Sequence, residues 1–169
     1  GTAAGHAMYK GKRIGVNIFA KIIPINIFNK FGSASLTNFY TALNWILENH
    51  VKLNPTSRYV INLSICYPQR TLRGDIVKVL NDLDSYKVIV VAAACNWGEP
   101  VAINMFGNYP QTLTVGSNDY SSPPKLSYFS GWDNKVGINA EGENIMSASH
   151  KSDNGIVAKS GTSMATPYV

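Results

Sequence analysis

Stretches with helical and with strand-like spacing of apolar residues follow one another along the chain. Apolar residues recur at helical spacing after Ser35 and again over residues 72–83, which predicts two amphipathic helices, the first of them capped by Ser35. The run at 88–94 is apolar throughout, as is typical of a strand that is buried on both faces of a parallel sheet. The predicted strands cover residues 21–27, 59–65, 88–94, 112–116, 136–139 and 156–158.

The order strand, helix, strand, helix, strand predicts the α/β fold class, as a three-layer open sheet that is mainly parallel with helices on both faces. Pro24 places the first strand at a sheet edge or near a strand end. Residues 153–155 read Asp-Asn-Gly and predict a tight hairpin turn before the last strand. No repeat or Gly/Pro/Ser-rich linker divides the sequence, so we expect residues 1–169 to belong to one domain.

Composition and charge exclude several classes of function. The chain is 45% hydrophobic and 15% charged, which is enough apolar material for a sizeable core. Its net charge of +5 is scattered, with Lys12-Arg13 the only adjacent basic pair, so no nucleic-acid surface is expected. No apolar run is long enough to cross a membrane. Cys66 and Cys95 form neither a metal-binding spacing nor a disulfide framework.

Residues 160–167 carry the strongest chemical signal, reading Ser-Gly-Thr-Ser-Met-Ala-Thr-Pro. Gly161 permits a tight turn that delivers Ser163 to the start of a helix, where free N–H groups and the helix dipole favour an anion. Such a serine can act as a nucleophile, or it can simply cap the helix. Asn96 follows the apolar strand at 88–94, where its amide can stabilise an oxyanion or serve as a turn residue.

This block resembles the nucleophile block Gly-Thr-Ser-Met-Ala-Thr-Pro of the subtilisin-like serine proteases, the subtilase family (peptidase family S8). Residues 91–96 read Val-Ala-Ala-Ala-Cys-Asn and resemble the family's Val-Ala-Ala-Ala-Gly-Asn. The short interval between residues 96 and 110 is similar to the proteinase K-like branch, which is typical of fungi. The resemblance implies a serine endopeptidase, with Ser163 as nucleophile and an oxyanion hole made by Asn96 and the Ser163 N–H.

The resemblance also implies two backbone edges that bind the substrate peptide. The first edge is Gly32, Ser33 and Ala34, and the opposing edge is Ser64, Ile65 and Cys66. Cys66 and Cys95 replace glycines of the family that form opposite walls of the first substrate pocket. We therefore expect a narrowed pocket that favours small residues, walls too far apart for a disulfide, and two free thiols that a thiol reagent would attack.

The family's remaining catalytic residues fall outside the chain. Residues 2–5 look like the end of the family's His-Gly-Thr-x-x-Ala-Gly block, so the resemblance places a histidine directly before Gly1 and the aspartate further upstream. His6, His50 and His150 are interpreted as surface histidines. Residues 1–169 are therefore expected to be a partial peptidase domain, inactive alone, from a protein with a polypeptide substrate and a pro-segment inhibitor.

A cellular location and calcium binding follow from the family only by resemblance. The family is secreted or vacuolar, and its relatives often bind calcium, but no acidic cluster here is dense enough to claim a calcium site and no cofactor is expected.

Two other functions compete with the peptidase hypothesis. A non-catalytic paralogue that binds or scaffolds peptide stays open, because the pocket glycines are changed. An esterase would need a Gly-x-Ser-x-Gly elbow, which the sequence around Ser163 lacks.

Overall fold

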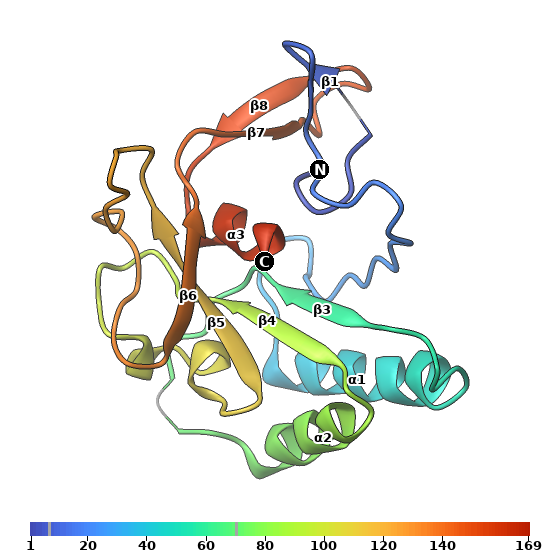
Figure 1. Ribbon diagram of the computed structural model, residues 1–169. Helices are drawn as coiled ribbons and strands as arrows, with labels where there is room; N and C mark the ends of the chain where they lie inside the picture. The colour runs from blue at the N-terminus through green and yellow to red at the C-terminus, as the bar shows by residue number, and fades with distance from the viewer. Residues whose placement is uncertain (7, 70) are drawn as a thin grey trace.

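A four-stranded sheet forms the centre of the computed structural model, which describes residues 1–6, 8–69 and 71–169 (Figure 1). The strand order is β3-β4-β5-β6, and every neighbouring pair runs parallel. The expected α/β fold with a mainly parallel sheet is therefore confirmed. The strands are β3 (Val60–Leu63), β4 (Ile89–Ala93), β5 (Thr112–Asn118) and β6 (Val136–Glu141).

Helices cover both faces of this sheet, as expected (Figure 1). Helices α1 (Leu36–Ile46) and α2 (Gly74–Ser85) lie on one face, and the short helix α3 (Thr162–Ala165) lies on the other. The Ser35 hydroxyl accepts a hydrogen bond from the Asn38 N–H and so caps α1, as the sequence predicts. Shorter helical turns are η1 (Leu47–Val51), η2 (Val101–Ile103), η3 (Phe106–Asn108) and η4 (Thr166–Tyr168).

The core shows why the run at 88–94 is apolar throughout. Successive side chains of a strand point to opposite faces of the sheet. Val90 and Ala92 therefore join the large core under α1 and α2, whereas Val91 packs with Val115 and Ala165 on the α3 side. Strand β4 is buried on both faces because helices cover both.

The hairpin expected before residues 160–167 is confirmed. Strands β7 (Ile145–Ala148) and β8 (Ile156–Lys159) pair antiparallel, and β8 leads directly into the turn before α3. A second hairpin, which the apolar pattern did not predict, joins the two-residue strands β1 (Met8–Tyr9) and β2 (Lys12–Arg13). None of the described helices is long and apolar enough to cross a membrane.

The strand predicted at 21–27 is wrong, because this segment has no strand neighbour in the structure. It runs without regular secondary structure along a groove of about 540 Å³ whose other walls are α1 and β3. Among the described residues β3 pairs with β4 alone, so its other side is an edge of the sheet. We call this side the free edge of β3.

Candidate active site

Gly161 shapes the turn that presents Ser163. Its φ of +149° and ψ of 158° belong to a region that residues with a side chain rarely adopt. A Cβ atom at this position would lie 3.1 Å from Asn96 Nδ2, so a side chain would also crowd that amide. Ser163 follows as the second residue of α3 and is half-buried. The structure thus places Ser163 at a helix start, where the sequence predicts it.

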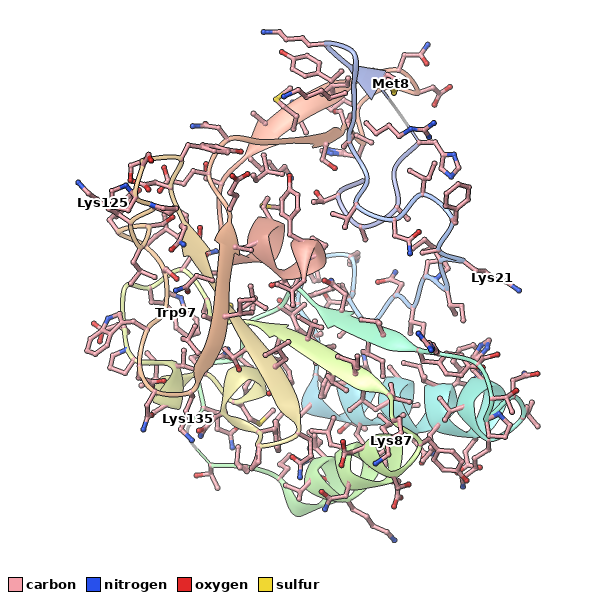
Figure 2. The ribbon with its side chains drawn as sticks, in the orientation of Figure 1. Met8, Lys21, Lys87, Trp97, Lys125 and Lys135 are labelled. Atoms are coloured by element: carbon pink, nitrogen blue, oxygen red, sulfur yellow. A yellow bond between two sulfur atoms is a disulfide. The ribbon has the colours of Figure 1, made fainter. Side chains whose placement is uncertain are left out.

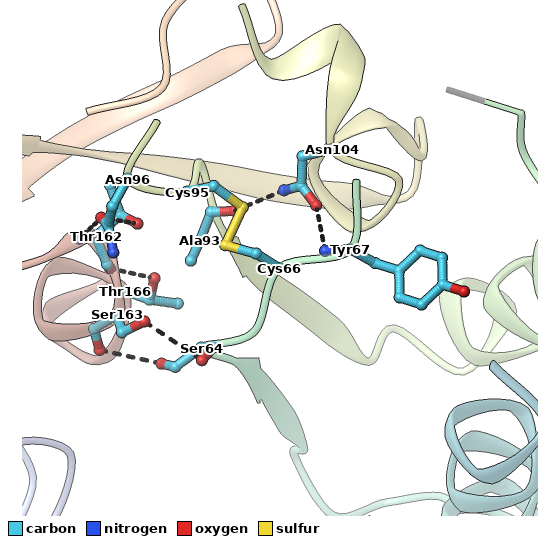
Figure 3. The surroundings of a disulfide bond; sticks show 10 residues. All are labelled: Ser64, Cys66, Tyr67, Ala93, Cys95, Asn96, Asn104, Thr162, Ser163 and Thr166. Atoms are coloured by element: carbon cyan, nitrogen blue, oxygen red, sulfur yellow. Dashed lines mark hydrogen bonds between the residues drawn. A yellow bond between two sulfur atoms is a disulfide. The ribbon is translucent and has the colours of Figure 1, made fainter. Parts of the chain in front are cut away.

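Asn96 contacts the same turn from the end of β4. Its Oδ1 accepts hydrogen bonds from the Thr162 N–H at 2.8 Å and from the Thr162 hydroxyl at 2.9 Å (Figure 3). Thr162 is fully buried, and its carbonyl accepts from the Thr166 hydroxyl at 2.7 Å, which fixes it in turn. Because the oxygen of the Asn96 amide is held in this way, the NH₂ group is the end that can donate to another molecule.

Ser64 contacts Ser163 from the end of β3. The Ser163 hydroxyl donates to the Ser64 carbonyl at 3.3 Å, and the Ser64 hydroxyl donates to the Ser163 carbonyl at 3.1 Å. The Ser64 hydroxyl also accepts from Asn62 Nδ2 at 2.9 Å, which orients it. In the described part of the chain no histidine is hydrogen-bonded to Ser163; His50, for example, contacts the Trp45 ring instead.

The expectation of two free thiols is wrong. Cys66 and Cys95 form a disulfide, with their Cα atoms 5.8 Å apart (Figure 3). The two residues follow β3 and β4, which are neighbouring parallel strands and therefore only about 4.8 Å apart, so the chain just beyond their ends stays within the ~4.4–6.8 Å that a disulfide needs. Cys95 has a φ of +71°, a backbone conformation that favours glycine, the residue that resemblance to the family leads one to expect there.

Asn104 holds the same two chain segments together, and the sequence analysis missed it. Its side chain is fully buried, and its Oδ1 accepts from the Tyr67 N–H at 3.2 Å while its Nδ2 donates to the Ala93 carbonyl at 3.0 Å. The Tyr67 carbonyl accepts from the Met105 N–H at 3.0 Å. One asparagine in an irregular segment gives no sequence signal for such a bridge, because it depends on tertiary contacts.

The two predicted substrate edges face one groove. Gly32, Ser33 and Ala34 line one side of a groove of about 360 Å³, and Ile65 and Cys66 line the other. Apolar side chains of α1 and η3 form the rest of its wall, including Leu36, Phe39 and Phe106. The two remaining residues of the predicted substrate site do not line this groove. Ser64 borders the larger groove, and Cys95, the disulfide partner of Cys66, is fully buried.

The Gly32–Ala34 edge is held by a turn that starts at Asn29. The Asn29 side-chain oxygen accepts from the Phe31 and Ser33 N–H groups, at 2.9 and 3.1 Å. Gly32 has a φ of +74°, which a glycine adopts without strain. This edge is therefore set by local hydrogen bonds rather than by pairing with the sheet.

Shifted pKa values occur in other parts of the molecule. Hydrogen bonds from the Ser121 hydroxyl and then the Lys125 N–H lower the pKa of Asp119, in the loop after β5, where Figure 2 labels Lys125. Burial raises the pKa of Tyr168 and of Tyr120, and nearby Glu141 adds to both. Among the described residues no group of three or more His, Cys, Asp or Glu side chains could hold a metal ion.

The chain is thus an α/β protein with Ser163 at a helix start and the Asn96 amide hydrogen-bonded beside it. The Subtilase family model matches residues 1–169, and the chain belongs to that family. It is 31% identical to a subtilisin-like protease of Coccidioides posadasii, over 94% of this chain and 38% of that protein. It is 28% identical to a cuticle-degrading serine protease of Arthrobotrys oligospora, over 94% of this chain and 37% of that protein.

A solved structure supports the same assignment. The crystal structure of a cold-adapted subtilisin-like serine proteinase superposes with a TM-score of 0.77 and 27% identity, covering 92% of this chain and 53% of that one. The chain thus spans less than two fifths of the two fungal relatives and about half of this proteinase. Subtilase membership and the subtilisin-like fold, both expected from the sequence, are confirmed.

Proposed function

We propose that residues 1–169 are the part of a serine endopeptidase that carries the nucleophile and the oxyanion hole. The observation that carries this proposal is the Asn96–Thr162 contact, which brings an amide donor next to the helix start that bears Ser163. The general base and the acid that orients it would come from a longer polypeptide containing these residues. Residues 1–169 alone would then have no peptidase turnover.

In this mechanism Ser163 Oγ leaves the Ser64 carbonyl, gives its proton to the base and attacks the carbonyl carbon of the scissile bond. The carbonyl oxygen becomes an oxyanion that accepts from Asn96 Nδ2 and from the Ser163 N–H at the start of α3. The amine product leaves with the proton, and water then hydrolyses the acyl group on Ser163. Removing one oxyanion donor of this kind typically lowers turnover by ~100- to 1,000-fold.

The substrate would bind in extended form, as a strand between the edge at Gly32–Ala34 and the edge at Ser64–Cys66. Cys66 lines this groove and is bonded to the buried Cys95, so the first pocket would be narrow beside Cys66 and would favour Gly, Ala or Ser before the scissile bond. The name of the Arthrobotrys relative refers to cuticle degradation, which takes place outside the cell. We propose the same secreted location, and a pro-segment as inhibitor, for the longer protein.

The test uses a longer polypeptide that contains residues 1–169 and a fluorophosphonate probe, which labels activated serines. We expect labelling of the wild type and of Ser160→Ala, and no labelling of Ser163→Ala. Ser160 is the matched control, because it lies three residues before Ser163 and its hydroxyl accepts from the Asn144 N–H. Labelling that persists in Ser163→Ala would refute the assignment of the nucleophile.

A second candidate function is a subtilase that binds peptide without cleaving it. It is favoured by the disulfide, because both cysteines replace glycines that line the first pocket in the rest of the family. Such a protein would bind an extended peptide in the groove, would not react with the probe at Ser163, and would bind equally well after Ser163→Ala.

A further inference from the structure

Two short segments hold the turn that presents Ser163. We call residues 64–67, which follow β3, the β3 arm, and residues 94–96, which follow β4, the β4 arm. The β3 arm contacts Ser163 through the two Ser64 hydrogen bonds of 3.1 and 3.3 Å. The β4 arm contacts Thr162 through the two Asn96 hydrogen bonds of 2.8 and 2.9 Å. Both arms lie beyond the ends of their strands, although the Ala94 N–H still donates to the Val115 carbonyl of β5 at 2.9 Å.

The disulfide is the covalent link between these arms. Cys66 lies two residues after Ser64, and Cys95 lies directly before Asn96. Figure 3 shows the bridge beside both contacts with the turn. Any change in the separation of the two cysteines therefore moves Ser64 and Asn96 relative to each other, and these residues bear on adjacent positions of the turn.

We propose that the Cys66–Cys95 disulfide is a positioning group for the proposed acyl transfer. It holds the Asn96 amide and the Ser64 carbonyl at a fixed spacing around Ser163, so that reducing the bridge slows acylation while the fold persists. This inference rests on the proposed function. A small movement of either arm would be enough for this effect, because a displacement of about 1 Å at a reacting group can cost ~100-fold in rate.

The contacts explain why a covalent link is needed at this point. The Asn96 side chain is exposed, so water competes for its hydrogen bonds to Thr162. Cys95 also holds a φ of +71°, which is unfavourable for a residue with a side chain and tends to relax unless the surroundings oppose it. The bond to Cys66 supplies that opposition.

The contacts also explain why the fold would survive without the bridge. The buried Asn104 side chain ties Tyr67 of the β3 arm to Ala93 at the end of β4 independently of the cysteines. The Cys95 carbonyl still accepts from the Gly131 N–H at 2.8 Å. Loss of the disulfide therefore removes the direct link between the arms and leaves the Tyr67 and Cys95 hydrogen bonds in place.

Reduction by a dithiol such as dithiothreitol proceeds by thiol–disulfide exchange. A thiolate of the reagent attacks Cys66 Sγ, because Cys95 is fully buried and Cys66 only partly. The S–S bond breaks and Cys95 leaves as a thiolate, which takes up a proton. The second thiol of the reagent then closes a cyclic disulfide and releases the Cys66 thiol, so two electrons and two protons pass from the reagent to the protein.

The test compares the oxidised and reduced longer polypeptide with Cys66→Ala, Cys95→Ala and the double variant. We expect the maximal rate of fluorophosphonate labelling at Ser163 to fall about 10- to 100-fold in all four bridge-free forms. Each single variant should match the double variant, because either change removes the same bond. Reoxidation of the reduced wild type should restore the rate. Amide exchange at the Thr162 N–H should become faster in step, since this group donates to Asn96.

Two controls separate positioning from stability. Leu80→Ala removes a fully buried side chain of α2, on the sheet face opposite α3, and should lower the melting temperature without lowering the labelling rate of the folded protein. The double variant Cys66→Gly, Cys95→Gly permits the left-handed backbone but lacks the bond, and should label as slowly as the alanine forms. Wild-type labelling in that glycine variant would mean that backbone strain, and not the link, is responsible.

The outcomes distinguish this inference from the proposed function. If the oxidised wild type is not labelled at Ser163, the proposed function fails. If the oxidised wild type is labelled, and every bridge-free form is labelled at the same rate as it with unchanged amide exchange at Thr162, the proposed function stands. The positioning role of the disulfide is then overturned.

Discussion

Replacing Asn96 separates its two roles, since the two ends of its amide do different things. Oδ1 accepts two hydrogen bonds from Thr162, whereas Nδ2 is the proposed donor to the oxyanion. Asn96→Ala removes both ends. It leaves the N–H of the fully buried Thr162 without its acceptor, which costs about 1–3 kcal/mol of folding free energy. For a chain of this size that corresponds to roughly 2–4 °C in melting temperature per kcal/mol.

Asn96→Asp is the matched variant, because the carboxylate keeps the acceptor for Thr162 while it loses the NH₂ donor and adds a negative charge. We expect Asn96→Asp to melt close to the wild type and Asn96→Ala to melt several degrees lower. Both variants of the longer polypeptide should hydrolyse a peptide ~100- to 1,000-fold more slowly than the wild type, with KM changed much less than kcat.

The assay is thus a pair of measurements, thermal unfolding and steady-state peptide cleavage, made on the same three proteins. Wild-type kcat in Asn96→Asp would refute the oxyanion role of the Nδ2 group. Unchanged melting of Asn96→Ala would instead show that water or another group satisfies the Thr162 N–H, and the anchoring argument would fail.

Three further predictions test separate features. Gly161→Ala should destabilise the fold by about 1–3 kcal/mol in thermal unfolding, because φ is +149° and the new Cβ would lie 3.1 Å from Asn96 Nδ2; unchanged melting would contradict this. Iodoacetamide should not alkylate Cys66 or Cys95 in the native protein until a dithiol is added, since the two cysteines are bonded to each other. Mass spectrometry detects the alkylation, and alkylation without the dithiol would contradict the disulfide. Hydrogen bonding lowers the pKa of Asp119, so the stabilisation by its carboxylate is present above pH ~4 and is lost as the pH falls further. The melting temperature of Asp119→Asn should therefore fall less steeply than that of the wild type between pH 5 and about 2.5. Equal slopes of melting temperature against pH would refute this role of Asp119.

A fifth prediction concerns the first pocket. A peptide library cleaved by the longer polypeptide should show a preference for Gly, Ala or Ser before the scissile bond. The variant Cys66→Gly, Cys95→Gly should accept Leu and Phe, even if it turns over more slowly. Equal preference for large aromatic residues in both proteins would contradict the idea that the bridge narrows the pocket.

Periodicity in the sequence predicts the elements of the fold where burial is strong, and fails where pairing is needed. The apolar run that became β4 and the faces of α1 and α2 could be predicted because each buries a regular set of positions. Residues 21–27 have the composition of a strand, but a strand also needs a hydrogen-bonded neighbour, and no local pattern supplies one.

At the site, the sequence predicts residue types and order, while the contacts come from the tertiary structure. The turn at Gly161 and the position of Asn96 after a buried strand could be read directly. The Cys66–Cys95 bridge was excluded by treating the two segments as distant pocket walls, although both follow strands that are neighbours in the sheet. The Asn104 tie could not be predicted, because both of its partners are backbone groups.

The free edge of β3 has a consequence for how this chain behaves in concentrated solution. The Ile89 N–H donates to the Tyr59 carbonyl, so by the alternation of a parallel ladder the main-chain groups of Val60, Asn62 and Ser64 point away from β4. A row of unpaired main-chain N–H and C=O groups along an exposed edge is a template for edge-to-edge association with another chain. The apolar side chain of Val60, which is 64% exposed, favours such association further. The last carbonyl of the row is the one that accepts from the Ser163 hydroxyl. Self-association along this edge would therefore compete directly with the Ser163 hydroxyl for the Ser64 carbonyl, so both interactions depend on a single oxygen atom.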